Sequence, residues 1–187
     1  MRDKIEAELH LLESMGVIAP VTEPTKWVSA LLVVAKANGS VRLCLDPKPL
    51  NAALKRVPYC MPTLQDILPQ LQKVKVMSSV DAKDGFFHCV LDHESSMLTT
   101  METPFGRWRW LRLPFGTSPS PEIFQSRLAT ALSGLQGIAY IADDILIFSP
   151  PMRMPPAYCI GWAIVTALSV RLSVCLSHYV LCKNGAR

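Results

Sequence analysis

The stretch Gly137-Ile-Ala-Tyr-Ile-Ala-Asp-Asp-Ile-Leu-Ile-Phe148 places two adjacent carboxylates, Asp143 and Asp144, inside an otherwise apolar run. The residues on either side of the pair, 138–142 and 145–148, have the composition of short strands, so the pair is predicted at a hairpin tip. A third carboxylate, Asp81, ends the stretch 76–80, which predicts a buried strand. Carboxylates beside buried strands are costly unless they are paired or bound to a cation.

If the strand before Asp81 lies beside the acidic hairpin, three carboxylates converge and repel one another without a cation. Hard oxygen ligands select magnesium or manganese, which also bind substrate phosphates. Two such ions, ~3.5–4 Å apart, are the arrangement for nucleotidyl transfer. From spacing alone, a simpler interpretation is favoured, in which Asp143-Asp144 is an ordinary turn and Asp81 a helix N-cap.

The first half of the chain carries local signals for a helix, a hairpin and a second helix. Residues 4–15 have helical spacing, and Gly16 is a C-terminal stop. Asn38-Gly39 separates two apolar runs and predicts a hairpin of residues 30–35 and 41–45. Thr63 and Asp66 form the pattern of a capping box for a helix over 64–74, which Pro69 should kink or shorten.

The second half is predicted to be mostly extended before one long helix. Extended pieces are expected over residues 86–91, 98–102 and 107–113, and a helix over residues 121–135. Trp108 and Trp110 alternate with arginines. This pattern has two interpretations: a nucleic-acid-binding surface of cations and aromatic rings, or a strand that directs both tryptophans into the core.

Four segments, in this order, together resemble reverse transcriptases of the gypsy-type retrotransposon polyprotein: 39–51, 80–87, 113–125 and 141–147. The run Thr103-Pro-Phe-Gly-Arg107 is also similar to sequences of that type, and the resemblance covers residues 4–149. Four ordered motifs are far more specific than any one of them. The chain departs from the family at Ile141, where a tyrosine is common, and at Pro69.

The resemblance implies an α+β fold, the fingers and palm of a right-hand polymerase, truncated and with the thumb absent. The fingers would comprise residues 1–55 and 89–119, and the palm residues 56–88 and 120–149. Residues 150–187 resemble no expected continuation and are interpreted as a non-homologous tail. Because the thumb is absent from this resemblance, we expect the chain to bind metal but not to carry out processive synthesis.

The resemblance also implies the roles of individual residues. Asp81, Asp143 and Asp144 would be catalytic and, with the backbone carbonyl of Ala82, would bind two Mg²⁺ or Mn²⁺ ions. Phe86 would exclude a 2′-hydroxyl, although plain core packing explains it equally well. The expected nucleotide-binding set, which includes Phe86, is Lys36, Arg42, Phe86, Phe115, Gly116 and Gln125.

The implied function is RNA-directed DNA polymerase, with an RNA or DNA template, a primer and deoxynucleoside triphosphates as partners. The parent polyprotein would also carry ribonuclease H and integrase. One alternative is a catalytically inactive remnant, which is consistent with the equal numbers of acidic and basic residues in 1–150, 15 of each. The sequence does not indicate an oligomeric state.

A second alternative is a membrane-associated protein driven by the tail, which carries the whole net charge of +4. Its apolar run, residues 157–170, is shorter than the ~20 residues that span a bilayer, so a membrane role is not favoured. No secretory signal opens the chain, and its six cysteines form no disulfide-scaffold pattern. We therefore expect an intracellular protein of the cytoplasm or nucleus, not a secreted one.

Overall fold

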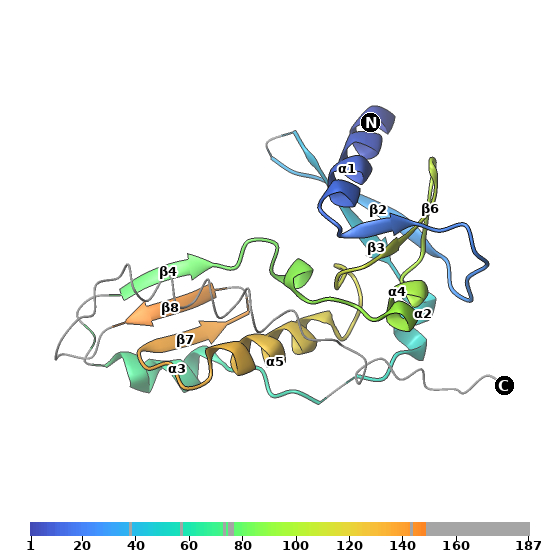
Figure 1. Cartoon of the computed structure of the whole chain (residues 1–187). Helices are drawn as coiled ribbons and strands as arrows, with labels where there is room; N and C mark the ends of the chain where they lie inside the picture. The colour runs from blue at the N-terminus through green and yellow to red at the C-terminus, as the bar shows by residue number, and fades with distance from the viewer. Residues whose placement is uncertain (38, 57, 73, 75–76, 143, 149–187) are drawn as a thin grey trace.

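A computed structural model describes residues 1–37, 39–56, 58–72, 74, 77–142 and 144–148. The predictions for Asn38, Asp143 and residues 149–187 fall outside the described residues. The fold is mixed α+β, with two sheets and helices packed on them, as the α+β prediction requires (Figure 1). Its elements are α1 Arg2–Ser14, β1 Ile18–Pro20, β2 Ser29–Ala35, β3 Val41–Asp46, α2 Lys48–Ala53, α3 Leu64–Leu71, β4 Met77–Asp81, the 3₁₀ helix η1 Gly85–His88, α4 His93–Leu98, β5 Met101–Thr103, β6 Gly106–Trp110, α5 Ser120–Leu132, β7 Ile138–Ile141 and β8 Asp144–Phe148.

The larger sheet has five strands in the order β1-β6-β5-β2-β3. Only the β2–β5 pair is parallel; the other neighbours run antiparallel. Helix α1 packs on this sheet through Ile5, Leu9 and Leu12, the three apolar positions that its helical spacing predicts, and all three are buried. Gly16 follows the helix with φ +66°, which confirms it as the stop signal.

The predicted hairpin of the first half is confirmed. Strands β2 and β3 are antiparallel, and Ala35 pairs with Val41 at the turn. Gly39 has φ +80°, the left-handed conformation that glycine adopts without a Cβ penalty. Beyond the hairpin, the capping box of Thr63 and Asp66 is also present, and α3 ends at Leu71, before the expected end at residue 74.

The smaller sheet has three strands in the order β4-β8-β7, all antiparallel. In the view of Figure 1, helices α3 and α5 lie below this sheet. On β8, Ile145 has no exposed surface and joins a core cluster with Phe124 and Leu128 of α5. Since side chains alternate along a strand, one face of the sheet is packed on the core and carries Ile145, and Asp144 is on the other face.

Three sequence-based predictions were wrong in part. Strand β4 is not buried, because it is the edge of its sheet, and the side chains of Ser78, Ser79 and Val80 are exposed. Residues 98–102 are only partly extended, because α4 ends at Leu98 and the strand begins at Met101. The Asp92 carboxylate caps α4 by accepting a hydrogen bond from the Ser95 N–H at 2.7 Å.

The extended piece predicted over residues 86–91 is replaced at its start by η1. The physical reason is aromatic packing. Phe86 and Phe87 are consecutive, yet both rings lie against Phe115, with centroid distances of 4.8 and 5.5 Å. Consecutive side chains on a strand point to opposite faces, whereas a helical turn can direct both toward one neighbour.

The tryptophans of β6 are core residues. Trp108 and Trp110 are buried, while Arg107 on the same strand is exposed, which favours the core interpretation over a stacking surface. Among the helices of the described ranges, none has the length and apolar character needed to span a bilayer.

Candidate active site

Asp81 and Asp144 occupy directly opposite positions on the antiparallel strands β4 and β8. Opposite residues of an antiparallel pair project to the same face, with Cβ atoms about 4.5–5.5 Å apart. That face is the one opposite the buried Ile145, and both aspartates are exposed. The structure therefore brings together two of the three predicted catalytic carboxylates, on the open face of the smaller sheet.

The backbone next to Asp144 is strained. Strands β7 and β8 are paired as far as Ile141 and Asp144. Ala142 has φ +51°, a left-handed conformation that costs a non-glycine residue roughly 1 kcal/mol. Asp143, the third predicted carboxylate, lies outside the described residues. Backbone strain of this kind is common at functional turns.

The donors present on this face fit a divalent metal. Two carboxylates directly opposite each other repel unless a cation lies between them, and their hard oxygens suit Mg²⁺ or Mn²⁺. Ala82 follows β4, so its backbone carbonyl is one residue from Asp81. Within the described ranges, which omit Asp143, no group of three or more potential ligands is found.

A second group of predicted residues forms an aromatic cluster. The Phe115 ring packs on Phe86 at 4.8 Å, and Phe86 packs edge-on against Phe124 of α5 at 5.6 Å. The guanidinium of Arg42, on β3, lies 5.1 Å from the centroid of the Phe115 ring. The hairpin of the larger sheet is thus connected through side chains to the helix beneath the smaller sheet.

Gly116 is fixed against β3 by close backbone contact. The Leu45 N–H donates to the Phe115 carbonyl at 3.1 Å. A Cβ on Gly116 would lie 2.1 Å from the Leu45 carbonyl oxygen, and the φ of Gly116 is +109°. Glycine is therefore required here by the packing of the chain on itself, which is a structural reason beyond the predicted approach of a nucleotide.

The two remaining predicted residues have contrasting environments. Lys36 follows β2 at the hairpin turn, where its side chain is exposed. Gln125 has no exposed surface, and neither atom of its amide has a hydrogen-bond partner among the described residues. Direct contact of Gln125 with a nucleotide is not possible without movement of its surroundings, so its role stays a prediction.

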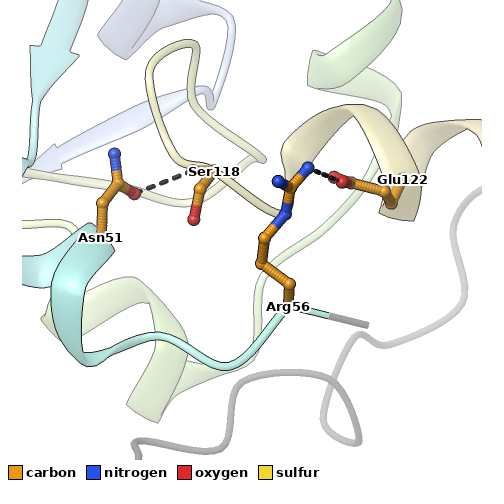
Figure 2. Close-up of polar contacts among 4 residues, drawn as sticks. All are labelled: Asn51, Arg56, Ser118 and Glu122. Atoms are coloured by element: carbon orange, nitrogen blue, oxygen red, sulfur yellow. Dashed lines mark hydrogen bonds and ion pairs between the residues drawn. The ribbon is translucent and has the colours of Figure 1, made fainter. Parts of the chain in front are cut away.

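Sequence reasoning missed the side chains that tie the 116–122 segment to α2 and the residues after it (Figure 2). The Asn51 side chain donates to the Gly116 carbonyl at 3.0 Å and accepts from the Ser118 N–H at 2.8 Å. Arg56 pairs with the nearly buried carboxylate of Glu122. The available signal was Asn51 itself, because asparagine is a poor helix former and needs a reason to lie in a helix.

A family model described as reverse transcriptase (RNA-dependent DNA polymerase) matches residues 34–170. This chain belongs to the reverse transcriptase family. The match extends past Pro150, into the segment predicted to be a non-homologous tail. The division of the chain into fingers, palm and tail stays a prediction.

Relatives of this reverse transcriptase chain are larger proteins. An uncharacterized protein of Caenorhabditis elegans, K02A2.6, is 40% identical over 148 residues, which are 78% of this chain and 12% of that protein. The enzymatic polyprotein of figwort mosaic virus is 33% identical over 152 residues, 79% of this chain and 23% of the polyprotein. The chain thus spans less than a quarter of the length of these two relatives.

Solved structures share the fold. A foamy virus protease-reverse transcriptase in complex with RNA/DNA hybrid has a TM-score of 0.74 and 21% identity, covering 96% of this chain and 24% of that one. The prototype foamy virus protease-reverse transcriptase gives a TM-score of 0.73 at 21% identity, over 92% of this chain and 23% of the other. The α+β reverse transcriptase fold predicted from the sequence is confirmed.

Proposed function

We propose that this chain carries the nucleotide-adding site of an RNA-directed DNA polymerase from a gypsy-type retrotransposon polyprotein. The observation that carries the proposal is the direct pairing of Asp81 with Asp144 on the open face of the smaller sheet. Family membership supports the chemical class, and the complexes of the foamy virus enzyme with nucleic acid are consistent with a primed template as partner.

The acidic face would hold the metal. Asp81 and Asp144, together with Asp143 and the Ala82 carbonyl, would ligate two Mg²⁺ or Mn²⁺ ions. When bound, such ions neutralise phosphate charge and lower the pKa of a coordinated hydroxyl, here that of the primer 3′ end. The chain's own contribution is a preorganised pair of carboxylates, because the β4–β8 register fixes their positions before any ligand arrives.

The hairpin and the aromatic cluster would bind the incoming deoxynucleoside triphosphate. Arg42 and Lys36 carry exposed positive charge on the hairpin of the larger sheet. Arginine suits bidentate contact with phosphate oxygens. Phe115 lies between Arg42 and Phe86, so one surface offers a cation for the phosphates and rings for the sugar and base.

Primer extension tests this proposal. The full chain, with manganese and a primed RNA template, is expected to add deoxynucleotides. Asp81→Asn, Asp143→Asn and Asp144→Asn should each lower the rate at least about a hundredfold. Glu6→Gln, which removes one exposed carboxylate from α1, is the matched control and should leave the rate unchanged.

Calorimetric titration with Mn²⁺ separates two ways of failing. Metal binding by wild type without extension would indicate a catalytically inactive remnant that keeps its metal site. Absence of metal binding by wild type, or equal binding by Asp144→Asn, would refute the metal site itself.

A further inference from the structure

The side-chain amide of Asn51, on α2, bonds to the segment between β6 and α5, at Gly116 and Ser118. Its Nδ2 donates to the Gly116 carbonyl at 3.0 Å. Its Oδ1 accepts from the Ser118 N–H at 2.8 Å (Figure 2). One amide therefore pairs with two backbone groups two residues apart. This pairing fixes the orientation of the intervening peptide units as well as their distance from α2.

The segment needs such a partner. Residues 114–119 form no strand or helix, so their backbone groups have no regular ladder to bond with. On the side of α5, the Ser120 hydroxyl donates to the Pro114 carbonyl at 2.9 Å. On the side of β3, the Leu45 N–H donates to the Phe115 carbonyl at 3.1 Å. Asn51 supplies a further attachment, to Gly116 and Ser118.

The contact joins the two parts of the molecule that the proposed function needs to align. Helix α2 directly follows β3, which carries Arg42. Ser118 lies just before α5, whose Phe124 packs on Phe86. Phe115 and Gly116 lie between these two elements.

Loss of the Asn51 amide would loosen this segment without unfolding the chain. Gly116 is exposed, so water can bond its carbonyl once Asn51 is removed. Helix α2 keeps its own backbone bonds, including the Leu54 N–H to the Leu50 carbonyl at 2.9 Å. The expected consequence is a less defined position for Phe115 and Gly116, with little change in global stability.

We infer that Asn51 is a positioning residue that holds Phe115 and Gly116 in the conformation that accepts the incoming deoxynucleoside triphosphate. The inference rests on the proposed function, because it assigns Phe115 and Gly116 to the nucleotide site. Asn51 acts through the backbone of Gly116 and Ser118 and does not itself contact the substrate.

The test compares Asn51→Ala with Ser118→Ala in the full chain. Ser118→Ala is the matched control, because it removes a hydroxyl that has no partner among the described residues and leaves the Ser118 N–H bonded to Asn51. Asn51→Gln keeps both the donor and the acceptor and serves as the conservative variant. Hydrogen–deuterium exchange of the Ser118 amide is the first readout, and it needs no ligand.

The second readout is the Kd of a matched deoxynucleoside triphosphate with Mn²⁺, on a primer–template whose primer ends in a dideoxynucleotide. Asn51→Ala should speed exchange of the Ser118 amide and weaken nucleotide binding, each about tenfold, with duplex affinity unchanged. Ser118→Ala should match wild type in both measurements, and Asn51→Gln should fall between the two.

The outcomes separate this inference from the proposed function. Unchanged Ser118 exchange in Asn51→Ala refutes the positioning role, whatever the chain binds. Faster exchange with an unchanged nucleotide Kd refutes the link between this segment and the nucleotide. If wild type binds no nucleotide while exchange responds as expected, the proposed function fails, and the role in nucleotide binding fails with it.

Discussion

Asp81 faces Asp144 across neighbouring antiparallel strands, on the side of the sheet away from the core. Two like charges in this position lower stability, typically by a few tenths to about 1 kcal/mol. A fold that keeps such a pair gains from a cation that binds between the two carboxylates. The pairing is therefore a cost of the free chain, and in the proposed function the same two carboxylates would ligate the metal.

Neutralising one member of this pair should stabilise the chain when metal is absent. We expect Asp81→Asn to raise the Tm in a chelating buffer by a small amount, because the cross-strand repulsion disappears. In Mn²⁺ the order should reverse, because only wild type gains stability from bound metal. Differential scanning fluorimetry in both buffers checks this, with Glu6→Gln as the control for loss of one exposed charge. Equal Tm shifts by Mn²⁺ in wild type and Asp81→Asn would contradict the expectation.

Gly116→Ala should be far more damaging than a substitution at another left-handed glycine. At Gly116 the new Cβ would lie 2.1 Å from the Leu45 carbonyl oxygen, whereas Gly134, with φ +82°, has no atom within 4 Å of its Cβ position. We expect a loss of more than about 2 kcal/mol for Gly116→Ala and about 1 kcal/mol for Gly134→Ala. Urea unfolding midpoints give both values. Equal losses at the two positions would show that the contact with Leu45 is relieved without cost.

Burial makes the Cys89 thiol a source of alkaline instability. Loss of solvation raises its pKa from 9.0 to about 11, an effect that Arg127 and Arg112 partly offset. The folded state therefore holds the thiol proton more tightly than the unfolded state. The resulting contribution to the free energy of unfolding is fully present below pH 9 and is lost as the pH rises toward 11. The loss should reach roughly 2–3 kcal/mol at the upper end of that range.

Cys89→Ala isolates this contribution, because it removes the titrating group and should flatten the decline in unfolding free energy between pH 9 and 11. Peptide-resolved alkylation provides a second check. Exposed Cys60 should react in the native chain, and buried Cys89 should react only on unfolding. Parallel pH profiles for wild type and Cys89→Ala would contradict the assignment.

The Arg56–Glu122 pair should contribute a measurable coupling energy. Glu122 is almost fully buried, with a side chain 10% exposed, and its second oxygen has no partner among the described residues. Arg56 is 70% exposed, so solvent screens its charge and reduces the value well below that of a fully buried pair. We expect a coupling of about 1 kcal/mol from a double-mutant cycle of Arg56→Ala and Glu122→Gln. Strictly additive effects would mean that the pair contributes no net stability.

Local features of this fold were predictable from the sequence because they depend on neighbouring residues. The capping box of Thr63 and Asp66 and the left-handed Gly39 are examples. The helix at Phe86 was missed because packing on Phe115 overrides an apolar run that is compatible with a strand. The exposure of β4 was missed because a sequence does not state which strand lies at the edge of a sheet.

The candidate site likewise has features that the sequence predicts and features that depend on tertiary packing. The sequence by itself determined which carboxylates end or interrupt stretches with the composition of strands, and its ordered motifs indicated the reverse transcriptase family. Only the tertiary structure decided that Asp81 is opposite Asp144 and that Asn51 holds Gly116 and Ser118. The physical reason is register: a shift of one residue between β4 and β8 would move Asp81 to the other face, and that register depends on packing between segments far apart in the chain.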